Sequence, residues 1–143
     1  MELYGKKIAP FHLPIRENEK FVGFVNVVKM EGRRFTNMSE YEACEIPEYT
    51  EKNLGIARDA LMEAVAETSE EYMERYFSGE EFTQDEIYTA VQTHVSEGNI
   101  VPVMMGSGIN CQGFNALLNA IDRYFPAPDY FECVGVDIST GER

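Results

Sequence analysis

The chain is short of the features that mark secreted and membrane-spanning proteins. Its 143 residues include three cysteines, Cys44, Cys111 and Cys133, and no two of them form a C-x-x-C pair. Three thiols cannot all pair within one chain, which favours a reducing, cytoplasmic setting over a secreted one. No apolar run approaches the roughly 18 residues of a membrane span, and no signal peptide opens the sequence. We therefore expect a cytoplasmic protein that makes no membrane contact.

Positive charge is scarce as well. Lys and Arg number 12 against 25 Asp and Glu, so the formal net charge is −13, and no lysine follows Lys52. Such a surface repels duplex nucleic acid, so we expect no direct nucleic-acid binding and favour a basic protein partner. Hydrophobic residues make up 44% and charged residues 26%, which is typical of a globular domain with a core of its own.

Residues that could bind a metal or catalyse a reaction are few and scattered. His12 has no acidic or thiol partner at metal-ligand spacing, and His94 falls on an apolar helical stripe, where a packed histidine is the commoner role. Cys111 lies near an expected helix start, where the helix dipole lowers a thiol pKa, although simple packing is the commoner role here too. No nucleophile–base pair or carboxylate dyad emerges, so we expect no metal site and no catalytic residue.

The first part of the chain has the alternation of β-strands. Residues 7–15 and 21–30 are predicted strands joined by a polar turn, and both faces of the second are largely apolar, which indicates that both are covered. Residues 31–46 are predicted to form a turn and one or two short edge strands.

Three helices are expected next. Residues 50–67 form the first, Ser69 caps a second that ends at Gly79, and a capping box at Thr83 opens a third that runs to about Ser96. The first helix should bury a stripe of residues spaced three and four apart, namely Leu54, Ala57, Leu61 and Val65.

The last part of the chain predicts a strand, a glycine loop and a helix. Residues 99–105 form a short apolar run typical of a central parallel strand, and residues 106–113 carry three glycines. The helix that follows places five apolar residues on one face: Phe114, Leu117, Leu118, Ile121 and Phe125. The fold class predicted for the whole chain is α+β, in two parts: antiparallel strands with helices, then a strand–loop–helix unit.

The glycine loop has several interpretations on its residues alone. Gly106, Gly108 and Gly113 resemble a dinucleotide-binding G-x-G-x-x-G, but the third glycine comes two residues late. The chain lacks G-x-x-x-x-G-K-[ST], and a phosphate site with no lysine nearby would be poor. A tight turn that binds nothing stays open.

Three segments together resemble one family, bacterial elongation factor G, a translational GTPase. They are "HLPIRENEKFVGFVNVVKM", "EEYMERYFSGEEFTQDEI" and "IVPVMMGSGINCQGFNALLNAIDRYFPAPD", in the family's order and at matching spacing, and the resemblance runs from about Lys7 to Pro128. The resemblance implies that residues 1–98 are the insert (G') subdomain. It implies that residues 99–128 are the last strand, base-recognition loop and final helix of a P-loop-type α/β G domain, and that residues 129–143 connect to the next domain.

The resemblance also implies a role for the loop. The family pattern G-S-A-F matches Gly106 and Ser107, then departs at Gly108 and Ile109. In the full-length parent, Ser107, Gly108 and Ile109 would bind guanine, the cofactors being GTP or GDP with magnesium. The two changed residues indicate a divergent member or a paralogue. Because glycine keeps its backbone N–H, the change from alanine would cost only about 0.5–1 kcal/mol of preorganisation.

The other GTPase motifs are absent from the sequence: a phosphate loop, D-x-x-G and N-K-x-D. We therefore expect this chain to be an excised, noncatalytic piece that binds no cofactor alone, from a parent GTPase that is monomeric. The strand at residues 99–105 would lack its G-domain neighbours, so the piece is expected to self-associate or to cover this strand otherwise.

The resemblance implies the ribosome as partner, with the insert meeting the basic ribosomal stalk protein. Asp59, Glu63 and Glu67, on one face of the first helix, are the candidate contacts, although a solvated helix face explains the same charges. Two alternatives remain: a free-standing acidic protein-interaction module, and part of a release-factor or ribosome-protection GTPase. The sequence does not decide whether the parent drives translocation, recycling or another ribosomal step.

Overall fold

A computed structural model describes residues 7–38 and 40–127, and the predicted connector at 129–143 lies outside these ranges, as does Cys133. The described chain combines two small sheets with four α-helices, so the α+β prediction is confirmed. The strands are β1 (Ile8–Pro10), β2 (His12–Glu17), β3 (Lys20–Asn26), β4 (Glu31–Phe35), β5 (Tyr41–Cys44) and β6 (Val101–Val103). The helices are α1 (Glu51–Ala66), preceded by a 3-10 turn at Glu48–Thr50, α2 (Glu70–Ser78), α3 (Gln84–Ser96) and α4 (Phe114–Tyr124).

The first predicted strand is divided between the two sheets. β2, β3, β4 and β5 form an antiparallel sheet in that order, whereas β1 pairs in parallel with β6. Phe11 marks the division, because its N–H donates to the Val103 carbonyl and its carbonyl accepts from the Val27 N–H, both at 2.9 Å. The prediction of one strand over residues 7–15 was therefore wrong, since the two ends of this segment pair with different partners.

The second predicted strand ends four residues early. β3 stops at Asn26, whose Oδ1 accepts the Lys29 N–H at 2.9 Å, and Met30 has a φ of 57°. A side-chain bond of this kind favours a turn over a continued strand. Both faces of β3 are covered as predicted, because the neighbouring Phe24 and Val25 are both buried.

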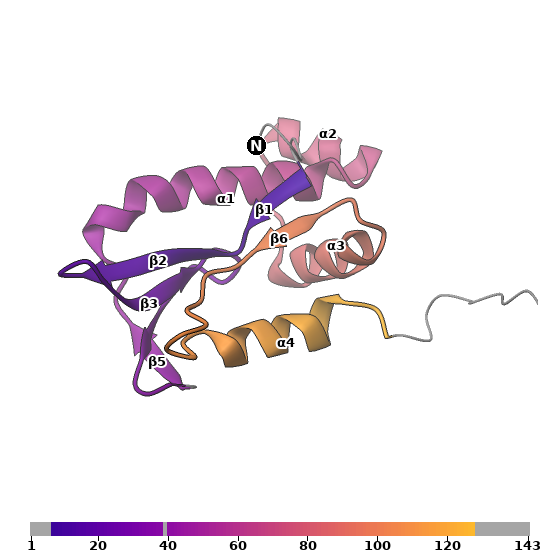
Figure 1. The fold of residues 1–143 in the computed structure, drawn as a ribbon. Coiled ribbons are helices and arrows are strands. Elements are labelled where there is room, and N and C mark those ends of the chain that lie inside the picture. Colours follow the sequence, from indigo (N-terminus) through magenta and orange to yellow (C-terminus); the bar gives the residue numbers. More distant parts are fainter. Residues whose placement is uncertain (1–6, 39, 128–143) are drawn as a thin grey trace, which may run out of the picture.

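The helices and the strands form layers around one core. α1 lies on one side of the strands and α4 on the other (Figure 1). The predicted stripe of α1 is confirmed, since all four of its residues are buried. The core cluster includes Val25, Leu61, Ile87, Ile100 and Ala120, and so continues across the predicted boundary between residues 98 and 99.

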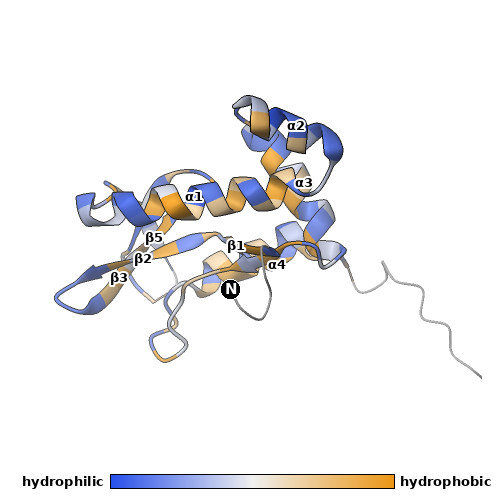
Figure 2. Cartoon of the chain, turned by 90° about the horizontal axis from the view of Figure 1, so that it is seen from above, coloured by the Kyte–Doolittle hydropathy of each residue, from blue (hydrophilic) through white to orange (hydrophobic). Residues whose placement is uncertain are grey.

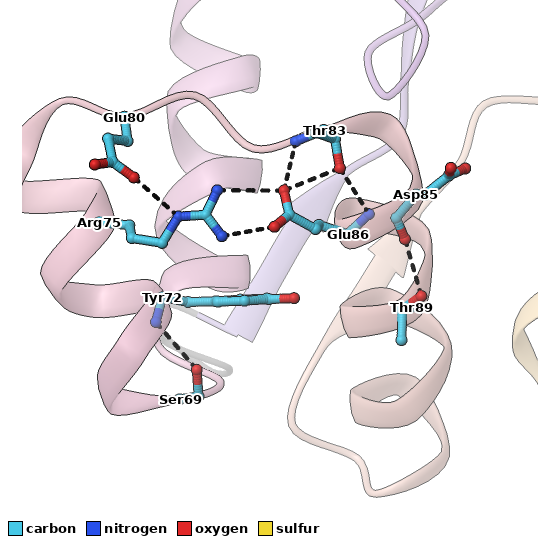
Figure 3. Close-up of polar contacts among 8 residues, drawn as sticks. All are labelled: Ser69, Tyr72, Arg75, Glu80, Thr83, Asp85, Glu86 and Thr89. Atoms are coloured by element: carbon cyan, nitrogen blue, oxygen red, sulfur yellow. Dashed lines mark hydrogen bonds and ion pairs between the residues drawn. The ribbon is translucent and has the colours of Figure 1, made fainter.

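The predicted caps of α2 and α3 are present (Figure 3). Ser69 Oγ accepts the Tyr72 N–H, and Gly79 ends α2 with a φ of 79°. Thr83 and Glu86 form the capping box of α3, in which each side chain bonds the other residue's backbone N–H. These bonds are local, which is why the sequence pattern predicted them.

The apolar face predicted for α4 lies at the surface instead of in the core. Ala116, Ala120 and Tyr124 are the buried residues of the helix. The larger apolar residues are 42–55% exposed and form what we call the outer face of α4: Phe114, Leu117, Leu118, Ile121 and Phe125. Hydropathy colouring shows that hydrophobic segments also lie along α1, whereas α2 is largely hydrophilic (Figure 2).

Two further observations concern the described ranges alone. No helix in them is both long and apolar enough to cross a bilayer. Their histidines, cysteines and acids also do not gather in groups of three or more that could hold a metal ion.

Candidate functional site

The loop between β6 and α4 closes on itself through its backbone. The Ser107 N–H donates to the Gln112 carbonyl at 2.9 Å, and the Gln112 N–H donates back to the Ser107 carbonyl at 3.1 Å. The Asn110 N–H also lies 3.4 Å from Ser107 Oγ. These bonds tie the base of the loop together, with Gly108 and Ile109 between them at its tip.

Gly113 determines how the loop enters α4. It has a φ of 81°, and a Cβ built there would lie 2.8 Å from the Met105 carbonyl oxygen. Both facts require glycine, because a side chain would be strained and would collide with backbone. The turn into α4 is therefore built by a close approach between its two ends.

Two backbone donors remain at the tip of the loop. Within the part of the chain that the structure describes, no hydrogen bond engages the N–H of Gly108 or Ile109. The Ile109 side chain is 95% exposed, and the space around the Gly108 Cα is open. Such N–H groups can donate to an acceptor atom of a ligand, for example a carbonyl on a planar base.

The structure therefore places the three predicted guanine-binding residues together, but their backbone N–H groups differ in hydrogen bonding. Gly108 and Ile109 have N–H groups to offer, while that of Ser107 is already bonded within the loop. Cys111 is also exposed here, with its Sγ 3.9 Å from the Gly108 carbonyl oxygen. Guanine binding by these residues stays a prediction.

Beneath the loop lies a histidine whose position the sequence did not predict. His12 is 4% exposed and stacks on Phe24 with ring centroids 4.1 Å apart. Burial lowers the pKa of His12 to about 4, and its hydrogen bond to the Met105 backbone opposes this shift. The ring is thus neutral at pH 7, and among the described residues its Nδ1 has no hydrogen-bond partner.

The candidate stalk residues follow one another along α1. Asp59 and Glu67 are exposed and Glu63 is half-buried. Beside them, the Arg58 guanidinium donates to the carbonyls of Val27 and Val28 at 3.0 and 2.9 Å. Arg58 therefore holds α1 to the turn after β3 and leaves the surface next to it predominantly acidic.

Known proteins resemble this chain over most of its length. No protein-family model matches the sequence. Elongation factor G of Neorickettsia sennetsu (strain ATCC VR-367 / Miyayama) is 38% identical over 121 residues, covering 81% of this chain and 17% of the relative. Over these residues the chain is similar to a segment of elongation factor G. The resemblance of its three sequence segments to that family is thereby confirmed.

A solved structure is similar over much of the chain as well. A protein from Thermus thermophilus superposes with a TM-score of 0.75 at 32% sequence identity, over 85% of this chain and 18% of that one. The chain thus spans less than a fifth of the length of either relative. It is similar to a segment of elongation factor G, a translation factor.

Proposed function

We propose that the chain is a noncatalytic segment of a larger, cytoplasmic elongation-factor-G-like GTPase, which binds and hydrolyses GTP and acts on the ribosome during elongation. The observation that carries this proposal is the loop with two unengaged N–H donors at Gly108 and Ile109. It follows β6 and enters α4, in the order expected of a base-recognition loop. Residues outside this chain would supply the phosphate-binding and catalytic groups.

The outer face of α4 supports a larger parent. Five large apolar side chains on one helix face are 42–55% exposed, and none of them belongs to the buried core of the described residues. The strand β6 likewise has one neighbour, β1, within the described sheets. A parent G domain would cover both features, and an excised piece would instead self-associate through them.

The cofactors of the parent would be GTP or GDP with magnesium. The residues present fit the base half of such a nucleotide, because Gly108 and Ile109 can donate to a ring carbonyl. They do not fit the phosphate half, since the sequence lacks the phosphate loop and its lysine. Two backbone hydrogen bonds contribute ~0.5–1.5 kcal/mol each, whereas micromolar binding needs about 8 kcal/mol.

Calorimetry of residues 1–143 with GTP and with GDP tests this part of the proposal. We expect no saturable heat at nucleotide concentrations up to about 1 mM. A dissociation constant in the low micromolar range would show that the chain holds the phosphates itself, which would contradict its assignment as a noncatalytic segment. Light scattering of the same sample tests self-association, and changing Leu117 and Leu118 to glutamate should abolish any dimer formed through α4.

We also propose the insert as the contact for the ribosomal stalk protein, through Asp59, Glu63 and Glu67. The exposure of Asp59 and Glu67 supports this, since a basic partner could reach both carboxylates. An Asp59→Lys/Glu67→Lys variant should weaken binding of the isolated stalk domain at low salt by about tenfold. A Glu19→Lys/Glu45→Lys variant makes the same charge change in the turn before β3 and just after β5, and should leave binding nearly unchanged. Equal effects of the two variants would assign the attraction to net charge.

A further inference from the structure

A cavity of about 370 Å³ lies between the antiparallel sheet and α4, apart from the tip of the glycine loop. The sheet contributes His12, Phe24 and Tyr41 to its lining. Ala120 and Tyr124 of α4 face them across the cavity. The volume lies within the ~300–1,000 Å³ of small-molecule sites.

The lining is rich in aromatic rings arranged at defined angles. The Phe24 ring stacks on His12 and meets Tyr41 edge to face, with centroids 4.1 and 5.5 Å apart respectively. On the opposite wall, Tyr88 of α3 stacks with Tyr124 at 6.2 Å. Burial raises the pKa of Tyr124 to about 12, so its hydroxyl is neutral at pH 7. A flat apolar ring would find aromatic partners on both walls.

Positive charge gathers around the same cavity, in a chain whose net charge is −13. Lys29, Arg33 and Arg123 line it, against the single acid Asp122. Arg33 already forms an ion pair with Glu31, in which Arg33 Nη2 lies 2.5 Å from Glu31 Oε2. No described carboxylate forms an ion pair with Lys29 or Arg123, and the Arg123 guanidinium lies 4.9 Å above the Tyr88 ring.

Lys29 and Arg123 also continue into an adjoining cavity. That second space is lined by the same Lys29, Tyr88 and Arg123, together with Gln84 and Glu31. The two cations therefore stand where the aromatic cavity meets this outer space. An anionic group placed there could reach an ammonium and a guanidinium while its ring stays among the aromatic side chains.

We propose that this cavity binds a small aromatic anion, with its ring between the sheet and α4 and its charged group between Lys29 and Arg123. The proposal does not depend on GTP binding or on the ribosome, because none of the loop-tip donors or acidic residues of α1 takes part. It gives a role to Lys29 and Arg123, which line an aromatic cavity and have no carboxylate partner among the described residues.

Phenyl phosphate is a suitable probe, with inorganic phosphate and phenol as its two halves. Titrated into ¹⁵N-labelled residues 1–143, phenyl phosphate should give saturable shifts at Phe24, Tyr41, Ala120 and Tyr124. Its affinity should exceed that of either half by about tenfold or more, because one site holds both ends of the molecule. The ring protons of His12 should move with the same dissociation constant.

Paired variants separate a built site from general attraction. Lys29→Met/Arg123→Met should weaken phenyl phosphate binding by about tenfold. Lys20→Met/Lys52→Met removes the same two charges elsewhere and should leave it unchanged. Asn119→Trp, on an exposed lining position of α4, should block the cavity without removing charge.

Several results would overturn the proposal. One is the absence of saturable shifts in the folded wild-type chain, judged by a dispersed spectrum. Another is equal weakening by the two double variants, which would indicate diffuse charge. A third is a set of shifts confined to the outer face of α4, which would place the probe on that surface instead.

Discussion

Arg75 and Glu86 face each other across the junction of α2 and α3, with Nη1–Oε1 and Nη2–Oε2 distances of 2.6 and 3.3 Å. The Arg75 Nε also lies 3.2 Å from a Glu80 carboxylate oxygen, and the guanidinium stacks 5.2 Å above the Phe82 ring. One side chain thus joins the end of α2, the connecting loop and the first turn of α3.

Replacing Arg75 should loosen this junction. Arg75→Met keeps most of the apolar stem but removes the paired bonds, so we expect a lower melting temperature than in wild type. Arg75→Lys should recover only part of the loss, because an ammonium cannot bond both oxygens in this planar way. Thermal unfolding followed by circular dichroism measures the change. Lys52→Met, an exposed substitution on α1, is the control and should change little.

The cap of α3 can be tested alone. Thr83→Ala removes the hydroxyl that accepts the Glu86 N–H and should destabilise the chain by about 1 kcal/mol. Thr83→Ser keeps the acceptor and should cost only a fraction of that. Urea unfolding gives both values, and equal losses for the two variants would show that the hydroxyl is not the stabilising group.

Acid should destabilise the chain through His12. Its pKa is about 4 in the folded chain and ordinarily 6.5, so the unfolded state binds more protons between these values. Stability should be full above about pH 6.5 and should fall as the pH drops towards 4, by roughly 3 kcal/mol if the whole shift is realised. His12→Phe should flatten this part of the stability curve. NMR titration of the imidazole gives the pKa directly, and a value near 6.5 would contradict the burial.

Acid should act on Glu86 at lower pH. The hydrogen bond from Arg75, followed by those with Thr83, lowers the pKa of Glu86 to about 2. Its contribution is therefore complete above about pH 4.5 and lost as the pH falls through 2. Carbon-detected NMR of the carboxyl group should show this titration, and Arg75→Met should move the midpoint upward.

Replacing two glycines of the loop by alanine should change stability to very different extents. Gly113→Ala places a methyl group 2.8 Å from the Met105 carbonyl oxygen at a φ of 81°, and should cost about 1–3 kcal/mol. At Gly108 a Cβ would meet no atom within 4 Å, so Gly108→Ala should change stability by less than about 0.5 kcal/mol. Urea unfolding of the matched pair is the measurement. A large loss at Gly108 would mean that the loop has another conformation.

The elements that the sequence predicted well are those with local causes. Ser69, Gly79 and the capping box at Thr83 act within one helical turn, so their spacing was sufficient to place the ends of α2 and α3. The buried stripe of α1 was equally accessible, because the helical period alone brings its residues to one face.

Contacts between distant segments escaped prediction. The periodicity of α4 shows that Leu117 and Ile121 share a face, but not that the core takes the opposite face, with Ala120 and Tyr124. The division of the first strand at Phe11 depends on β6, far along the chain. The position of His12 beneath the loop at Met105 has the same origin, so no local signal in the sequence could have revealed it.

The backbone of Phe11 has a mechanical consequence. A single residue donates to Val103, beside the loop, and accepts from Val27, beside the antiparallel sheet. Tilting that sheet about β6 would strain one of these bonds, so a force on the antiparallel sheet is passed to β6, the strand that leads into the loop of Gly108 and Ile109. One residue's backbone thus couples the antiparallel sheet to the strand that precedes the glycine loop.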